Sequence, residues 1–197
     1  TVGALNDAPL TGGLPDLFDI DNNVVSVPIG PAFSDAEGDT LSFSATGLPA
    51  GLSINPATGE IFGQVANNAS TIGGGVYTVT LTANDGNGGI TSTTFTWTIT
   101  NTAPFAGDDV GATDEDTPVT LNVLGNDTDP DLDPLTIVSA TATNGSVIVN
   151  ANGTLTFTPD PDFNGTATVT YLITDGNGGF STATAVITVA PVNDAPD

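Results

Sequence analysis

The sequence predicts an all-β protein of two β-sandwich domains, and three observations support this fold class. Short stretches that alternate polar and apolar residues are separated by Gly, Asn, Asp and Pro, which is typical of strands and turns. The segment Asn6–Pro9 returns in similar form as Asn101–Pro104 and Asn193–Pro196. The turn sequence Asp85–Gly89 reappears unchanged as Asp175–Gly179. These repeats indicate two modules built on one plan.

The clearest strands form one predicted hairpin in each module. Along the stretch from Thr94 to Thr100, Phe95, Trp97 and Ile99 alternate with threonines, which predicts a half-buried strand with the large side chains in a core. The repeated Gly-rich turn joins this strand to the strand that precedes it, as in a β-hairpin. The other inward positions are Tyr77, Val79 and Leu81 in the first module, and Val169, Tyr171, Ile173, Ala183, Ala185, Ile187 and Val189 in the second.

Shorter alternating stretches predict the remaining strands. They are Leu41 with Phe43, Val119 with Leu121 and Val123, Val147 with Val149, and Leu155 with Phe157. No stretch has helical periodicity, and the strand spacing is typical of a sandwich. We therefore predict two tandem Greek-key β-sandwiches, end to end, over residues 1–100 and 101–197.

The composition excludes several kinds of chemistry. The 197 residues include no Lys, Arg, His, Cys or Met, and 23 Asp and Glu give a formal net charge of −23. Disulfides, thiol nucleophiles, Schiff bases and His-assisted serine triads are therefore excluded. Nucleic-acid binding is excluded as well, because it needs cationic side chains. We expect no enzymatic activity, since no group of unlike catalytic side chains is evident.

The acids are concentrated in loops. The loop Ser34–Asp39 and the loop Asn126–Asp133 both carry acids at alternate positions directly before a predicted strand. Neighbouring carboxylates repel by about 1 kcal/mol at 4 Å even in water. Dissolved cations must offset this repulsion, and Ca²⁺, with its flexible shell of oxygen ligands, suits these loops better than Mg²⁺. The alternative is an acidic, solvated surface without bound metal.

Longer motifs resemble a known family. The segments Pro31–Phe43, Leu52–Ile61 and Tyr77–Gly86 are similar, in this order, to the signatures of cadherin-type domains, in particular to the dystroglycan-type or Ig-like variant of bacterial surface proteins. The second module resembles the bacterial cadherin-like tandem repeat through Asp114–Val119 and Asn152–Gly165. Such repeats are found in the large RTX-type adhesins that Gram-negative bacteria secrete.

The resemblance implies several Ca²⁺ ions, held at the interdomain junction and in the terminal loops. Thr102 departs from the family pattern, which has an acid at that position of the linker. The resemblance and the acidic loops together predict thirteen metal ligands, which are Asn6, Asp7, Asp35, Glu37, Asp39, Asp85, Asn101, Glu115, Asp129, Asp131, Asp175, Asn193 and Asp194.

The predicted function is that of a Ca²⁺-rigidified extracellular extender or adhesion module, secreted or at the bacterial cell surface. The alternative is a Ca²⁺-dependent module that binds carbohydrate or protein. We expect a monomer whose partners are adjacent repeats of the same chain, with carbohydrate or a host or biofilm surface as further candidates. No apolar run approaches the roughly 18 residues of a membrane span, so membrane insertion is not expected. We interpret the sequence, which has no signal peptide, as a piece of a longer protein.

Overall fold

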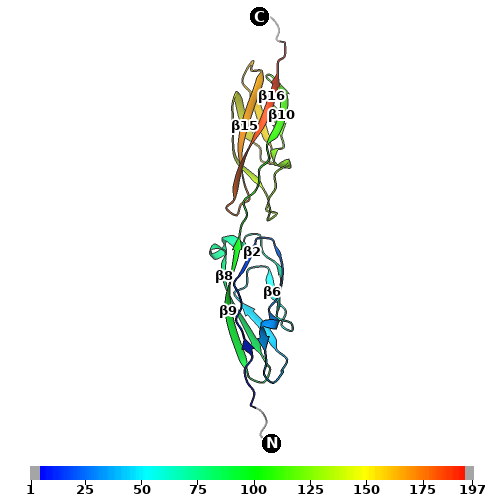
Figure 1. Ribbon diagram of the computed structural model, residues 1–197. Helices are drawn as coiled ribbons and strands as arrows, with labels where there is room; N and C mark the ends of the chain where they lie inside the picture. Colours follow the sequence, from blue (N-terminus) through cyan, green and yellow to red (C-terminus); the bar gives the residue numbers. More distant parts are fainter. Residues whose placement is uncertain (1–4, 194–197) are drawn as a thin grey trace. The chain divides into compact units, whose positions relative to one another are not determined.

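Antiparallel and parallel β-strands make up both halves of the chain in a computed structural model that describes residues 5–193 (Figure 1). The chain divides into two units, Thr1–Asn101 and Thr102–Asp197, one residue beyond the boundary expected from the repeats. Among the described residues, no helix is long and apolar enough to cross a membrane.

The first unit contains two packed sheets and a short two-stranded pair. Its elements are β1 (Leu10–Thr11), β2 (Leu17–Ile20), β3 (Val24–Pro28), η1 (Gly30–Ala32), β4 (Phe33–Ser34), β5 (Ser42–Thr46), β6 (Leu52–Ile54), β7 (Glu60–Gln64), η2 (Ala69–Gly75), β8 (Val76–Asn84) and β9 (Ile90–Thr100). One sheet has the order β2-β9-β8-β5 and the other the order β3-β7-β6, while β1 pairs with β4. The chain leaves the first sheet after β5 and returns to it at β8, as in a Greek key.

The second unit repeats this arrangement. Its elements are β10 (Asp109–Asp114), β11 (Val119–Leu121), η3 (Val123–Gly125), β12 (Thr136–Ala142), β13 (Gly145–Val149), β14 (Leu155–Pro159), β15 (Gly165–Thr174) and β16 (Phe180–Ala190). The sheets have the orders β10-β16-β15-β12 and β11-β14-β13. Two packed sheets in each unit confirm the predicted all-β sandwich fold.

Alternation of burial along the long strands forms the two cores. Phe95, Trp97 and Ile99 on β9 are buried, and so are Val79 and Leu81 on β8, whereas the threonines between them are at least partly exposed. The predicted core position of Trp97 is therefore confirmed, and the hairpin of β8 and β9 pairs as expected. The second core repeats the pattern with Val169, Tyr171, Ile173, Ala183, Ala185, Ile187 and Val189.

The structure corrects the prediction at two places. Val123 does not continue the strand of Val119 and Leu121, because it begins the 3-10 helix η3 and fills the core from there with no exposed surface. The sequence also predicted no strand at the positions of the outer strands β2 and β10, which run parallel to β9 and β16 (Figure 1). A parallel pair joins segments far apart in sequence, so no turn signal marks it.

Candidate metal centre

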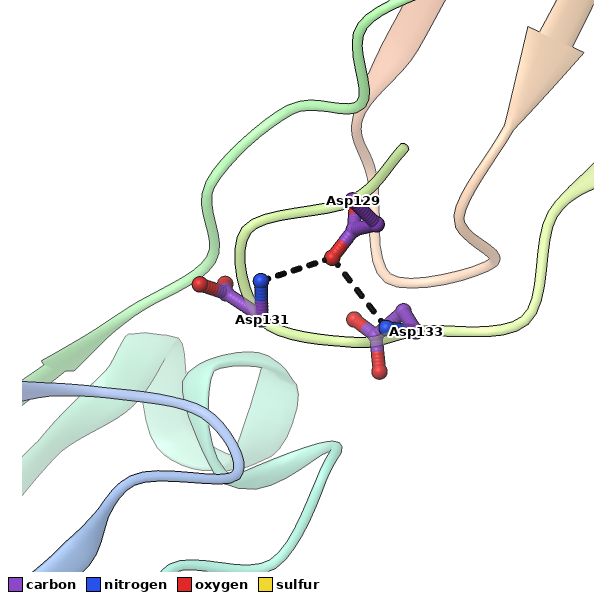
Figure 2. A group of neighbouring side chains, drawn as sticks. All are labelled: Asp129, Asp131 and Asp133. Carbon is purple, nitrogen blue, oxygen red and sulfur yellow. Dashed lines mark hydrogen bonds between the residues drawn. The ribbon is translucent and has the colours of Figure 1, made fainter. Parts of the chain in front are cut away.

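The loop between η3 and β12 gathers three carboxylates. One oxygen each from Asp129, Asp131 and Asp133 lies within 4.8 Å of the other two, and the three residues are 8%, 1% and 5% exposed. Figure 2 shows their side chains around a single turn of the loop. The turn is held by Asp129, whose Oδ1 accepts hydrogen bonds from the backbone N–H groups of Asp131 (2.8 Å) and Asp133 (3.1 Å).

The turn between β15 and β16 supports this loop. Asp175 Oδ1 accepts the N–H groups of Asn177 (2.8 Å) and Gly179 (2.9 Å), which closes the turn. The side chain of Asn177 then donates to Asp133 Oδ2 (2.7 Å). This bond joins the turn to the acidic loop, so two segments far apart in sequence form one polar site.

The linker at the start of the second unit also contacts the loop. The N–H of Thr102 donates to Asp131 Oδ2 at 2.6 Å. At Gly179 the chain passes so closely that a Cβ atom would lie 2.8 Å from the Cα of Ala103 and 2.0 Å from Asp175 Oδ2. Glycine is therefore required at the end of this turn, because no side chain fits there.

The first unit contains the same network of bonds. Asp35 Oδ1 accepts the N–H groups of Glu37 and Asp39, both at 3.0 Å, and Asn87 donates to Asp39 Oδ2 at 2.8 Å. The linker is again attached, since Asn6 donates to Asp85 Oδ2 (2.8 Å) and the N–H of Asp7 to Glu37 Oε2 (3.4 Å). The bond from Asn6 lowers the pKa of Asp85, with further lowering from backbone N–H groups of the turn.

These loops have the properties of a cation site. Asp35 Oδ2 and Asp129 Oδ2 are buried and accept no hydrogen bond. The chain has no cationic side chain that could neutralise them. An uncompensated buried carboxylate is costly unless a proton or a metal ion is bound. Carboxylate and amide oxygens are ligands that Ca²⁺ accepts, so the residues present fit this ion.

Comparison with known families gives a consistent result for both units. Residues 101–188 match the family model described as "Bacterial Ig domain". Residues 8–100 match the model described as "Putative Ig domain". The chain is a tandem of immunoglobulin-like domains. No curated protein matches it significantly.

Several solved structures resemble the immunoglobulin-like tandem at low identity. An endo-fucoidan hydrolase of glycoside hydrolase family 107 is 19% identical with a TM-score of 0.43, over 98% of this chain and 30% of that one. N-cadherin EC1-4 of Drosophila is 16% identical with a TM-score of 0.46, over 93% and 50%. Human protocadherin-24 EC1-2 is 15% identical with a TM-score of 0.42, over 97% and 100%. The chain thus spans less than a third of the hydrolase, and none of these likenesses bears on function.

Glu115 lies away from the acidic loop of the second immunoglobulin-like domain. Its N–H bonds the carbonyl of Ala190 at the end of β16, whereas Asp175 precedes the start of that strand. Its carboxylate accepts the N–H of Val192 (2.5 Å) and the side chain of Asn164 (3.3 Å). The predicted ligands of this domain therefore occupy both of its ends and do not form one site.

The corresponding acid of the first domain is Asp21, which was not among the predicted ligands. Its N–H bonds the carbonyl of Thr100 at the end of β9, as Glu115 does at the end of β16. Asp21 has no exposed surface and accepts hydrogen bonds from the backbone N–H (2.9 Å) and the hydroxyl of Ser70. The thirteen predicted ligands leave it out because Asp and Glu replace each other at this position within different local sequences.

The other predicted ligands are distributed as follows. Asn101 is half-buried after β9, and Asn193 is exposed after β16. Asp194 lies outside the described residues. Asp133 belongs to the carboxylate group but was not predicted, although its spacing of four from Asp129 repeats that of Asp39 from Asp35. This repeated spacing was the signal that would have identified it.

Proposed function

We propose that the chain is a Ca²⁺-stabilised extender module of a secreted bacterial surface adhesin, and that it has no catalytic role. The observation that supports this proposal is the pair of equivalent carboxylate loops, Asp35–Asp39 and Asp129–Asp133, in a chain without any cationic side chain. The immunoglobulin-like fold of both domains is common in extracellular proteins, and it fits a structural role.

The loops link metal binding to the linkers. Asn6 and Asp7 bond to Asp85 and Glu37 in the first domain, and Thr102 bonds to Asp131 in the second. Ca²⁺ bound to these carboxylates would fix the acidic loop and, through these bonds, the segment of linker attached to it. A linker held in this way loses flexibility, which is what an extender requires.

The affinity expected for such sites suits the outside of a cell. Extracellular Ca²⁺ modules bind with dissociation constants of about 10⁻⁴ to 10⁻³ M, so the sites would fill in extracellular fluid and not in cytoplasm. A site at a hundredfold excess of ion over its dissociation constant adds about 2.7 kcal/mol of stability. This gain is comparable to that of a disulfide, which a chain without Cys cannot form. The same proposal includes the origin of the chain: we propose that it is part of an RTX-type adhesin that acts in biofilms.

One observation favours a second function, the Ca²⁺-dependent binding of a carbohydrate or protein. A cavity of about 480 Å³ lies beside the acidic loop of the second domain, lined by Leu124, Asp127, Thr128, Asp129, Leu132, Asp133 and Leu135. Two of the candidate metal ligands, Asp129 and Asp133, therefore face a space that a ligand could enter. A glycan array probed with and without Ca²⁺ distinguishes this function from that of a spacer.

A calcium titration by calorimetry tests the main proposal. We expect binding in the submillimolar to millimolar range and a melting temperature that falls when EDTA removes the ion. Asp131→Asn should weaken one binding event, because it removes a carboxylate from the group of three. Asp160→Asn is the matched control, since Asp160 is an exposed acid of the same domain outside this group. Equal melting temperatures in Ca²⁺ and in EDTA would contradict the proposal.

A further inference from the structure

The cavity beside the acidic loop of the second domain has both apolar and acidic walls. Leu124, Leu132 and Leu135 line it together with Asp129 and Asp133, and its volume is about 480 Å³. Ligand pockets in proteins typically measure about 300 to 1,000 Å³ and combine mainly apolar walls with a few polar groups. A bare metal ion uses only oxygen ligands, so it gives the leucines no partner. The cavity therefore suits a group that has both an apolar part and a positive charge.

The positive charge has to come from outside the chain. Asp129 is 8% exposed, and its Oδ2 is buried and accepts no hydrogen bond. Asp133, which lines the same cavity, is 5% exposed. A buried carboxylate is costly unless a donor or a cation compensates for it. The chain has no Lys, Arg or His, so a basic side chain at these carboxylates must belong to another molecule.

Leu132 provides independent support for a partner with an apolar part. It has a positive φ that leucine rarely adopts, and its side chain is largely exposed, so it adds nothing to the core. The first domain has Gly38 at this position of the loop. It has Phe33, a core residue, at the position of Asp127, which also lines the cavity. The same loop therefore folds without either side chain, and both are specific to the cavity of the second domain.

We propose that this cavity binds an arginine side chain of a partner protein. The guanidinium group would lie against Asp129 and Asp133, and the aliphatic stem would lie along Leu132. Arginine suits the cavity better than lysine, because its planar group can form two parallel hydrogen bonds with a carboxylate and is more weakly hydrated. The net charge of −23 attracts a basic partner over a distance. The inference rests on the second function proposed above, since it concerns the same cavity, but it does not require Ca²⁺ in the loop.

An NMR titration of the isotope-labelled full chain tests this proposal. The probe is the peptide acetyl-Gly-Arg-Gly-amide, and the control peptide has citrulline, an uncharged analogue with the same stem, in place of arginine. We expect the arginine peptide to shift the amide signals of Thr128, Leu132 and Asp133, and not that of Gly38 in the first domain. The citrulline peptide should bind roughly tenfold more weakly, because the charge-assisted hydrogen bonds are lost.

Two variants test the apolar and the acidic wall of the cavity separately. Leu132→Gly should weaken the binding of the arginine peptide about fivefold, because an apolar contact is lost, and should leave Ca²⁺ binding unchanged, because every carboxylate remains. Asp129→Asn keeps one oxygen for the two backbone hydrogen bonds of the turn, and it should weaken the peptide about tenfold. The controls Leu10→Gly and Asp160→Asn change exposed residues outside the cavity and should leave the affinity unaltered.

The titration is carried out without added metal and again in about 1 mM Ca²⁺, a concentration at which extracellular Ca²⁺ modules are filled. Ca²⁺ should weaken the peptide several-fold, because the ion and the guanidinium group share Asp129 and Asp133. Equal binding of the arginine and citrulline peptides in both buffers would overturn the proposal, as would an affinity that Leu132→Gly leaves unchanged. These results would not affect the proposed Ca²⁺ site, which calorimetry tests without peptide. Peptide binding without any heat of Ca²⁺ binding would contradict the proposed extender function and support the arginine site.

Discussion

Leu132 adopts a backbone conformation that leucine rarely takes. Its φ is +63°, and its side chain is 82% exposed, so burial does not compensate for the strain. In the first domain the same position in the loop is Gly38, with φ of +81°. Two loops of one design thus meet the same backbone requirement, one with glycine and the other with a strained leucine.

Replacing this leucine should stabilise the second domain. We expect Leu132→Gly to raise the free energy of unfolding by about 0.5 to 1 kcal/mol, because the relief of strain exceeds the entropic cost of glycine. Urea denaturation in saturating Ca²⁺ measures the change. The reciprocal control, Gly38→Leu, has open space for its Cβ and should be destabilising through φ alone. A loss of stability in Leu132→Gly would show that the side chain makes contacts that its exposure conceals.

At the level of single residues, the sequence predicted the kind of chemistry of the acidic loops better than it predicted which residues belong to each site. The oxygen-rich loops were recognised because Asp35 and Asp129 begin the same spacing of acids. Asp21 was not among the thirteen predicted ligands, since its position depends on burial and on its hydrogen bonds with Ser70, which lies far from it in the sequence. Local spacing carries no information on contacts between residues far apart in the chain.

The hairpin turn that ends in Gly179 contacts the acidic loop through the hydrogen bond from Asn177 to Asp133. Two of its glycines are needed for different reasons. Gly176 has a φ of +82° and open space around it, whereas Gly179 has no positive φ but has neighbours so close that no Cβ atom fits. Substitutions at Gly176 and at Gly179 therefore test backbone strain and steric crowding separately within one turn.

We expect Gly179→Ala to destabilise the second domain by about 1 to 3 kcal/mol, because its Cβ would overlap Asp175 and the linker. The same variant should weaken Ca²⁺ binding, which calorimetry measures, since Asp175 and Asn177 would be displaced. Gly176→Ala is the control, with a loss of about 1 kcal/mol and little change in Ca²⁺ affinity. Equal Ca²⁺ affinities in the two variants would argue against a link between turn and loop.

At the level of elements, the sequence predicted strands that are long or joined by short turns. The hairpin of β8 and β9 and that of β15 and β16 were evident, because apolar alternation and the repeated turn agree. The short outer strands β2 and β10 were not predicted, since their partners β9 and β16 lie some eighty residues away in the chain. Pairing at this distance is decided by the completed sandwich and not by local pattern.

The net charge of the whole molecule should govern its response to salt. With a charge of −23 and no cation in the chain, all long-range electrostatic interactions between side chains are repulsive. We expect the melting temperature in EDTA to rise when NaCl increases from about 0.01 M to about 0.1 M, because the Debye length falls from about 30 Å to about 10 Å. Differential scanning calorimetry measures this shift. A melting temperature independent of salt would indicate that neighbouring carboxylates are already neutralised by protons.

The parallel pairing of β10 with β16, from Asp109↔Ala185 to Asp114↔Ala190, determines how this domain responds to mechanical load. A pull on its two ends draws these strands past each other along their length, so their hydrogen bonds are sheared together rather than unzipped singly. The pair of β2 with β9 in the first domain is loaded in the same way, over fewer residues. Under tension, each domain would therefore resist extension through the pairing of its edge strand β2 or β10 with β9 or β16, and the second domain, with the longer pairing, would yield after the first.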